Sequence, residues 1–522
     1  SGINEQGIPQ FQETWKVGNF STIREYQITN QVYRFVSSSF LGELPKEYLS
    51  ATLQSHVTLS QGKSNHLMSL SLQPIIKENG QFKILEAFDL AYVLENEKKS
   101  KRDERAQTEA SVLSSGTWYK IAIDKSGVYR LNKRFLENLG VDTSNLDPRN
   151  IRVFGNGGKM LPQVNGEFRY KGLQENSLWV FGEEDGEFDN SDYVAFYAQG
   201  PDDWVVTDAN VVSHRKNIYS DLSYYFLSVD NGQGKRIQEQ IPIAAMATHA
   251  VTTSKTYEFF EEEKVNLLNA GQQWFGDLFT RNSTAKNYQF RFDNLDTSQE
   301  VRVRVRAMAQ SAVSSSMTVQ INQNNAFDLN FSPISAGAFV KANAKIAENS
   351  AQLSSEDVTV TVQYNNTTDP AGFARLDYIE VIADKNLVAE GTQFGFRNFL
   401  SKEAGNVLEY SVANATEIDQ LWDVTDQLNP KKIQNLQPGM SDFVFKGGGG
   451  ELKEYVVVSE MDFHIPTIPE NPLVANQNLH ALKDVQYLIV TNANLASEAQ
   501  RIADYHIVNS GLTVEVVTLD KI

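Results

Sequence analysis

Apolar and polar residues alternate along much of this chain, which is the pattern of β-strands that bury one face. In residues 301–306, three valines alternate with three arginines. Similar runs cover residues 56–59, 67–72, 288–292, 317–321, 358–362 and 376–382. Many strands joined by long connections between residues 243 and 462 predict a β-sandwich of the jelly-roll kind. We therefore expect a mainly β, multidomain protein.

The arginines of this alternating strand are Arg302, Arg304 and Arg306. A row of arginines on one face of a sheet could bind an anionic glycan or the acidic face of a partner. The simpler interpretation is a solvated face on which the arginines pair with nearby carboxylates, and exposed pairs of that kind contribute little to stability. The pattern favours the solvated face.

The end of the chain has a different pattern. Residues 485–490 form a nearly continuous apolar run, typical of a strand that is covered on both faces. Asn492 and Asn494 follow, and either could cap a helix. Apolar residues then recur at helical spacing: Leu495, Ala499, Ile502, Tyr505 and Val508. Gly511 stands where a left-handed C-terminal residue is expected, and residues 512–517 form a second, β-branched strand.

A strand–helix–strand unit normally places its two strands in parallel with a right-handed crossover. A parallel pair needs further strands beside it and helices on both faces. We therefore expect the chain to be the front portion of a longer protein, in which chemistry at the ends of this sheet depends on residues beyond Ile522.

Shifts in composition and pattern divide the chain into six expected segments. They are a small β-rich N-terminal domain (1–96), a charged linker (97–116), an α+β domain (117–242), the β-sandwich region (243–462), a proline-containing linker (463–480), and the first β-α-β unit of an α/β domain (481–522).

Composition limits the possible functions. The chain has 47 Lys and Arg against 65 Asp and Glu, a net charge of −18, which argues against nucleic acid as a partner. It contains no cysteine, so it carries no disulfide, no thiolate metal site and no cysteine nucleophile. Its 522 residues are enough for three or four domains.

Two loops contain residues that could bind a ligand. The glycines at residues 155–158 follow a strand, but no Lys-Ser or Lys-Thr and no good helix come after them, so a tight turn is favoured over a phosphate cradle. The acidic loop 183–192 could wrap calcium through Asp185, Asp189 and Asp192, although its spacing does not match a helix–loop–helix calcium site. A plain acidic hairpin loop is the alternative.

Sequence motifs for catalysis are absent from these residues. The chain has no G-x-S-x-G elbow, no H-E-x-x-H and no Walker loop. Its histidines and tryptophans are scattered, and packing roles are favoured for them.

Several stretches together resemble one protein family. The terminal YLIVTN, the helix and GLTVEVVTLDKI resemble the opening of the caspase-like α/β domain of gingipain-type cysteine peptidases. SGTWYKIAIDKSGVYRL and NIRVFGNGG resemble the domain that precedes the peptidase in the type IX secretion sortases of this family. QQWFG at 272–276 and ARLDYIEVI are similar to its middle β region. The resemblance runs from about Gly116 onward.

The resemblance implies that the parent protein is a cell-surface cysteine endopeptidase of Bacteroidetes-type bacteria, associated with the outer membrane after removal of a signal peptide. The family removes the C-terminal sorting domain from secreted cargo and, by transpeptidation, joins the new carboxyl end to anionic lipopolysaccharide. A thiolate attacks the scissile carbonyl and a histidine handles the protons. No position here matches either residue, so both are expected beyond Ile522. The implied partners are a PorV-like outer-membrane barrel, other type IX attachment-complex proteins, cargo sorting domains and anionic lipopolysaccharide.

A second interpretation needs no catalysis. The protein could be a surface module whose β-sandwich holds a glycan or a protein partner. Sequence past Ile522 would discriminate the two, because a histidine and a cysteine after successive strand ends would support the peptidase.

Overall fold

The structure is a computed structural model that describes residues 2–3, 7–17, 22–42, 44–61, 66–78, 80–95, 110–164, 167–207, 211–230, 232–334, 340–366, 368–389 and 391–522. The chain forms two compact units, Ser1–Glu109 and Ala110–Ile522. Most of the predicted charged linker, residues 97–109, lies outside the described residues. None of the described helices is both long and apolar enough to cross a bilayer.

The first unit is β-rich, as expected. Its described strands are β1 (Gly2–Ile3), β2 (Pro9–Val17), β3 (Thr22–Val36), β4 (Gln54–Gln61), β5 (His66–Gln73), β6 (Ile75–Glu78) and β7 (Gln81–Glu95). They pair antiparallel in the orders β1-β2-β5-β4 and β3-β7-β6. Met68, Leu70 and Leu72 alternate along β5 and are buried in the core of this unit. The period of two read from the sequence thus places the core face correctly.

The second unit begins with an α+β region. Its elements are β8 (Trp118–Ile123), β9 (Gly127–Asn132), α1 (Lys133–Leu139), β10 (Arg152–Phe154), β11 (Glu175–Asn176), β12 (Trp179–Phe181), β13 (Tyr193–Ala198), β14 (Asp203–Val206), β15 (Val212–Arg215) and β16 (Ser223–Ser228). Asn132 caps α1 by accepting a hydrogen bond from the Phe135 amide at 2.9 Å, and Gly140 ends the helix at φ 98°. Both helix boundaries therefore follow from local residue types, a capping asparagine and a glycine with positive φ.

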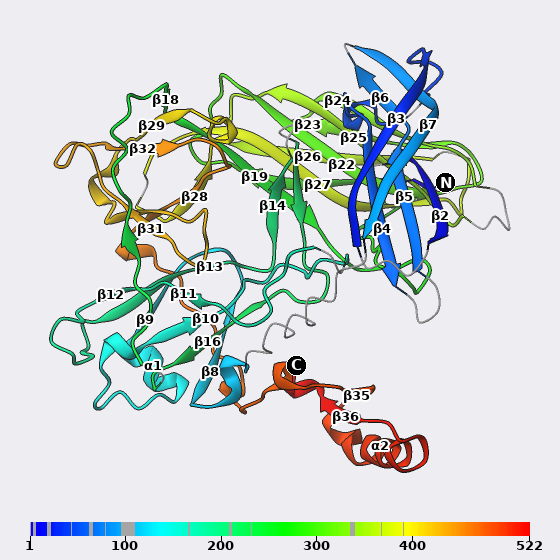
Figure 1. Cartoon of the computed structure of the whole chain (residues 1–522). Coiled ribbons are helices and arrows are strands. Elements are labelled where there is room, and N and C mark those ends of the chain that lie inside the picture. Colours follow the sequence, from blue (N-terminus) through cyan, green and yellow to red (C-terminus); the bar gives the residue numbers. More distant parts are fainter. Residues whose placement is uncertain are drawn as a thin grey trace. The chain divides into compact units, whose positions relative to one another are not determined.

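A β-sandwich region follows. Its strands are β17 (Gln238–Glu239), β18 (His249–Val251), β19 (Thr253–Glu261), β20 (Leu278–Thr280), β21 (Ala285–Arg291), β22 (Glu300–Gln310), β23 (Ser315–Ile321), β24 (Asn324–Phe331), β25 (Asn343–Gln352), β26 (Asp357–Asn365), β27 (Phe373–Asn386), β28 (Phe394–Arg397), β29 (Val407–Val412), β30 (Gln420–Asp423), β31 (Lys431–Ile433), β32 (Phe443–Gly448) and β33 (Glu454–Val458). The strands are labelled where space allows in Figure 1.

One long sheet runs through this region. Among the described strands it has the order β17-β31-β30-β33-β28-β19-β27-β22-β25, with β20 also paired to β27. The valines at 301, 303 and 305 are buried on the face of β22 that belongs to the core shared with the sheet β21-β26-β23-β24. A separate core joins β28, β30, β31 and β33 to the sheet β18-β29-β32. The predicted β-rich multidomain fold is confirmed.

The segment expected to be a proline-containing linker packs on the α+β region. It contributes β34 (Leu473–Val474), which pairs antiparallel with β8. Bridges from Thr467 to Ala122 and from His464 to Tyr129 tie it down further. Short 3-10 helices occur at Lys46–Tyr48, Val112–Ser114, Pro148–Asn150, Phe399–Lys402, Ala415–Glu417, Glu460–Asp462, Leu479–Ala481, Ala493–Leu495 and Leu519–Lys521.

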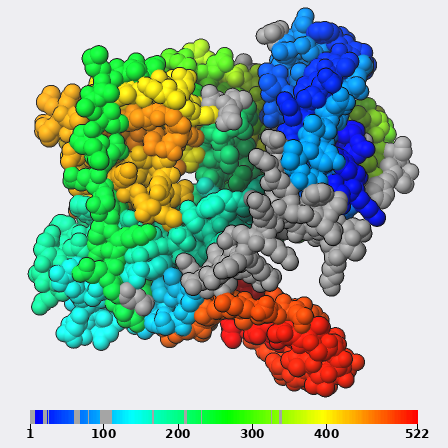
Figure 2. Space-filling view, in the orientation of Figure 1, coloured from blue at the N-terminus to red at the C-terminus, as the bar shows by residue number. Residues whose placement is uncertain are grey.

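The chain ends in the predicted β-α-β unit, drawn in red in Figure 2. β35 (Tyr487–Thr491) and β36 (Val514–Thr518) are parallel, and α2 (Ala496–Ser510) ends at Gly511 with φ 63°. Asn492 is the N-cap residue of the 3-10 helix Ala493–Leu495, which runs directly into α2, but its side chain makes no capping hydrogen bond. Asn494 caps no helix, and the N-cap of α2 itself is Leu495.

The apolar stripe of α2 also differs from the one expected. The buried residues are Ala499 and Ala503, whereas Ile502 and Val508 are exposed. Leu488 on β35 is 52% exposed, although its run had suggested a strand covered on both faces. The unit therefore uses small side chains to pack helix on strands and presents larger ones outward.

The glycine-rich segment 155–158 bends at Gly158 without a backbone hydrogen bond across it, and no helix follows it. A Cβ added at Gly155 would lie 2.3 Å from the ring of Tyr225, and one at Gly158 would lie 2.4 Å from Ser223 Cβ. These glycines are required because neighbouring side chains pack directly on the backbone.

Replacing Gly155 with alanine is predicted to lower the free energy of unfolding by about 1–3 kcal/mol, because the new methyl group would overlap Tyr225. Gly448→Ala is the matched control, since its nearest atom is an ordinary 3.8 Å away. Urea unfolding of both variants measures the difference, and equal stability of the two variants would contradict the packing argument.

Candidate functional site

The outer face of the long sheet carries a ladder of charged and aromatic side chains. Across β19, β27, β22 and β25, one row consists of Phe259, Glu380, Arg304 and Glu348. The next row contains Glu261, Tyr378 and Arg306. Because side chains alternate along a strand, these residues lie opposite the valine core.

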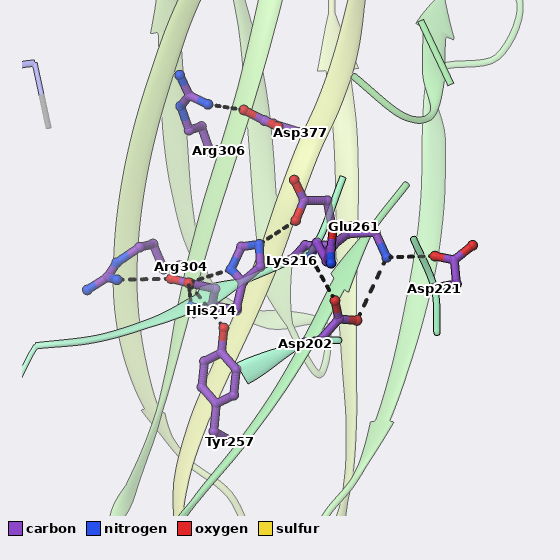
Figure 3. Close-up of polar contacts among 11 residues, drawn as sticks. Asp202, His214, Lys216, Asp221, Tyr257, Glu261, Arg304, Arg306 and Asp377 are labelled. Carbon is purple, nitrogen blue, oxygen red and sulfur yellow. Dashed lines mark hydrogen bonds and ion pairs between the residues drawn. The ribbon is translucent and has the colours of Figure 1, made fainter. Parts of the chain in front are cut away.

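The β14–β15 hairpin of the α+β region covers this ladder. Arg304 Nη1 donates to the carbonyl of Val212 at 2.8 Å, and the His214 amide donates to Glu380 Oε1 at 2.8 Å. Trp204 stacks on Tyr257 with ring centroids 5.7 Å apart and planes 3° apart. The β14–β15 hairpin thus covers the polar face of the long sheet, where His214 lies near Glu261, Arg304 and Tyr257 (Figure 3).

His214 is the centre of this contact. Its Nδ1 lies 2.7 Å from Glu380 Oε1 and its Nε2 lies 2.5 Å from Glu261 Oε2. The imidazole also stacks on Phe259 at 4.6 Å and meets Tyr378 edge-on at 4.7 Å. Burial alone would lower the pKa of His214, but its hydrogen bonds and the charges of the two carboxylates outweigh burial and raise the pKa to about 9. His214 is therefore a cation at neutral pH.

Glu380 has 0% exposure and is fully hydrogen-bonded. Besides both His214 contacts, Oε1 accepts from the Tyr257 hydroxyl at 3.1 Å, and Oε2 accepts from Arg304 Nη1 at 2.9 Å. Burial would raise the pKa of Glu380, but the hydrogen bonds and charges of His214 and Arg304 lower it overall. A buried carboxylate is tolerated only with such partners.

A second ion pair flanks the first. A bulge between Arg306 and Ala307 shifts the register against β27, and Asp377 forms an ion pair with Arg306. Burial outweighs the charge of Arg306 and raises the pKa of Asp377 to about 6. Burial, followed by the hydrogen bond and charge of Glu261, raises the pKa of nearby Glu263 to about 7.

The other strand of the hairpin has its own anchor. Arg397 of β28 donates to the carbonyl of Trp204 at 2.9 Å and to Glu454 at 2.8 Å, and it contacts Asp203 at 3.4 Å. Its guanidinium lies 4.4 Å from the Trp204 ring centroid, a cation–π contact. Lys159 pairs with Asp203 at 2.7 Å.

This cluster is suited to positioning and not to chemistry on a substrate. The side chains of His214, Arg304 and Glu380 are closed to solvent, and their polar atoms are engaged with one another. The predicted pairing of arginines with carboxylates is confirmed for Arg304 and Arg306. The expected solvated face is wrong at Arg304, because the hairpin buries it.

The predicted calcium residues lie in the acidic loop between β12 and β13, which pair as a hairpin. Asp192 is buried and accepts from the Asp189 amide at 2.6 Å and the Ser191 hydroxyl at 3.3 Å, whereas Asp185 accepts from the Glu187 amide at 3.0 Å. Within the described residues, no group of three or more acidic or histidine side chains is arranged to hold a metal. Calcium binding stays a prediction without geometric support.

Sequence reasoning missed His214 and Glu380. Glu380 did carry a signal, because it is a carboxylate inside the apolar run 376–382 and can face the arginines of 301–306. His214 carried none, since the hairpin that delivers it is distant in sequence.

The architecture defines a β-rich multidomain fold that ends in an α/β unit. No protein-family model and no curated protein matches the chain. Among solved structures, it is similar to dimeric latent PorU from Porphyromonas gingivalis, with a TM-score of 0.68 and 24% identity. The match covers 78% of this chain and 38% of that chain, so this chain spans well under half of PorU's length. At this identity the likeness shows a PorU-like fold.

Carbohydrate-binding modules also match, but only over single domains. The module CBM36 in complex with calcium and xylotriose matches with a TM-score of 0.17 and 16% identity, over 24% of this chain and 98% of that one. CBM35 from Cellvibrio japonicus matches with a TM-score of 0.17 and 13% identity, over 25% and 99%. Scores this low support no functional argument.

Replacing Arg304 with methionine is predicted to destabilise the protein by about 3–5 kcal/mol, because Glu380 would keep its buried charge with one partner fewer. Arg302→Met on the same strand face is the control, and we expect it to cost less than about 1 kcal/mol. Urea unfolding measures the loss of unfolding free energy for each variant. Equal losses would show that the contact of Arg304 with buried Glu380 does not stabilise the fold.

The raised pKa of His214 predicts a stability that depends on pH. The protonated form is favoured in the folded state, so its contribution is complete below pH 6.5 and is lost as the pH rises through about 9. Between pH 6.5 and about 9, we expect the free energy of unfolding of the wild type to fall by on the order of 3 kcal/mol more than that of His214→Asn. Urea unfolding of both proteins at several pH values measures this difference. His480→Asn, at an exposed histidine, is the control. A wild-type slope that matches His214→Asn would show that His214 is not charged.

Proposed function

We propose that this chain is the N-terminal accessory region of a cell-surface cysteine endopeptidase of the gingipain type, similar to PorU. In this proposal the β domains hold and orient an α/β peptidase domain of which residues 481–522 are the opening unit. The PorU-like fold supports the proposal, together with the motifs that resemble the type IX secretion sortases.

One observation carries the proposal: the terminal unit presents apolar surface on its strands and its helix. Leu488 and Val490 on β35 are about half exposed, and Val508 on α2 is 79% exposed. Parallel strands are normally covered on both faces, so this unit is suited to pack against further strands and helices. A peptidase domain of the α/β kind would supply them.

The chain itself has no thiol, so its part in the reaction is positional. The nucleophilic thiolate and the histidine would come from the remainder of the peptidase domain. There they would remove the C-terminal sorting domain of type IX cargo and transfer the cargo to anionic lipopolysaccharide. We further propose a location on the outer surface of the outer membrane, with a PorV-like barrel and other attachment-complex proteins as partners.

The parent protein provides the test. A thiol-reactive peptide probe is predicted to label the active parent once, as read by intact mass, while the 522-residue chain remains unlabelled because it has no cysteine. Leu488→Asp is expected to leave the stability of the 522-residue chain nearly unchanged and to abolish labelling of the parent. Arg501→Ala on the exposed side of α2 is the control.

Two outcomes would contradict the proposal. An active parent that is never labelled by the probe would remove the peptidase and favour a surface module that binds a glycan or a protein. Full labelling of the Leu488→Asp parent would remove the packing role of the terminal unit.

A further inference from the structure

A cavity of about 510 Å³ opens between two regions of the second unit. One wall is formed by the 155–158 segment, β11 and the residues around Gln199 and Tyr225. The loop 425–428, which follows β30 of the long sheet, forms the other wall. Its volume falls within the range of small-molecule sites.

Two nearly buried carboxamides line this cavity with unused hydrogen-bonding atoms. Gln199 and Asn176 are each 3% exposed. Asn176 Nδ2 donates to the Gly155 carbonyl at 3.0 Å, but within the described residues no group bonds to Asn176 Oδ1 or to the Gln199 carboxamide. These carboxamide atoms are not among the described polar atoms that are shut off from water without a partner, so they face the open space of the cavity with donors and acceptors that no described protein group uses. Their position at a cavity wall therefore points to a ligand.

The 155–158 segment is shaped to leave room for Gln199. Gly157 has φ +80°, and a Cβ there would lie 2.7 Å from Gln199 Oε1. The backbone of Gln199 is fixed independently, because its amide donates to the Tyr225 hydroxyl at 2.7 Å. The carboxamide is thus held in place by packing and keeps its donor and acceptor free.

The charged groups of the cavity are already engaged with protein partners. Lys159 pairs with Asp203 at 2.7 Å. Asp426 accepts from the amides of Leu428 and Asn429 and from the Asn429 side chain, at 3.0–3.3 Å. No helix follows the glycine-rich segment, so a phosphate has no helix N-terminus to bind. These contacts favour an uncharged ligand.

The available groups match hydroxyls better than a peptide backbone. Backbone groups at the wall are used, since the Gly155 amide donates to Gln174 and the Ser177 amide donates to Leu428. A carboxamide offers a donor and an acceptor side by side, which suits neighbouring hydroxyls that do both. Tyr170 lines the same cavity and is exposed, so its ring can cover the apolar face of a sugar. We infer that this cavity is a binding site for a neutral saccharide.

This inference does not rest on the proposed peptidase function, and the purified 522-residue chain is sufficient to test it. An array of neutral hexose and N-acetylhexosamine oligosaccharides identifies the best probe, and calorimetry at up to about 5 mM measures its affinity. Gln199→Met is expected to weaken binding about tenfold or more. It should leave the thermal midpoint nearly unchanged, because no described protein group bonds to the carboxamide and methionine has a side chain of similar length.

Two further comparisons complete the test. Tyr170→Ala should weaken binding while Tyr170→Phe retains it, and Gln310→Met, at an exposed glutamine, should have no effect. The inference is overturned if no neutral oligosaccharide binds, if Gln199→Met and Tyr170→Ala bind as wild type, or if unstructured peptides bind in place of sugars.

Discussion

The buried carboxylate of Glu380 is the group on which the arrangement of the second unit depends. A charge with no access to water must be surrounded by donors. Two of those donors, the amide and the imidazole of His214, belong to the β14–β15 hairpin, and the others belong to β19 and β22. The carboxylate is therefore satisfied only when the α+β region is docked on the sandwich.

The two faces of the long sheet consequently have different physical roles. The valine face of β22 supplies apolar burial, which is strong but not directional. The arginine face supplies contacts that are directional, because each needs its partner at hydrogen-bond distance. Arg304 secures one strand of the hairpin and Arg397 the other, so the hairpin is held at both edges. We interpret the buried charges as fixing orientation, while the apolar core provides most of the stability.

The features that could be predicted from the sequence are those that depend on residues close together in the chain. Local patterns predicted the alternation in β5 and β22 and the parallel terminal strands, because each depends on neighbouring residues. The burial of Arg304 could not be predicted from its own strand, since the covering hairpin begins about a hundred residues earlier. The same limit applies to the cavity, where Gln199 and the 425–428 loop meet only after folding.

The two α-helices show how one kind of pattern can serve two purposes. α1 buries Phe135, Leu136 and Leu139 in the core of its own region. α2 turns Ala499 and Ala503 toward its strands and leaves larger apolar residues such as Ile502 outside. Alanines permit close approach of helix and strands, so the larger side chains are not needed for that contact. Their burial would require a second surface on the opposite side of α2.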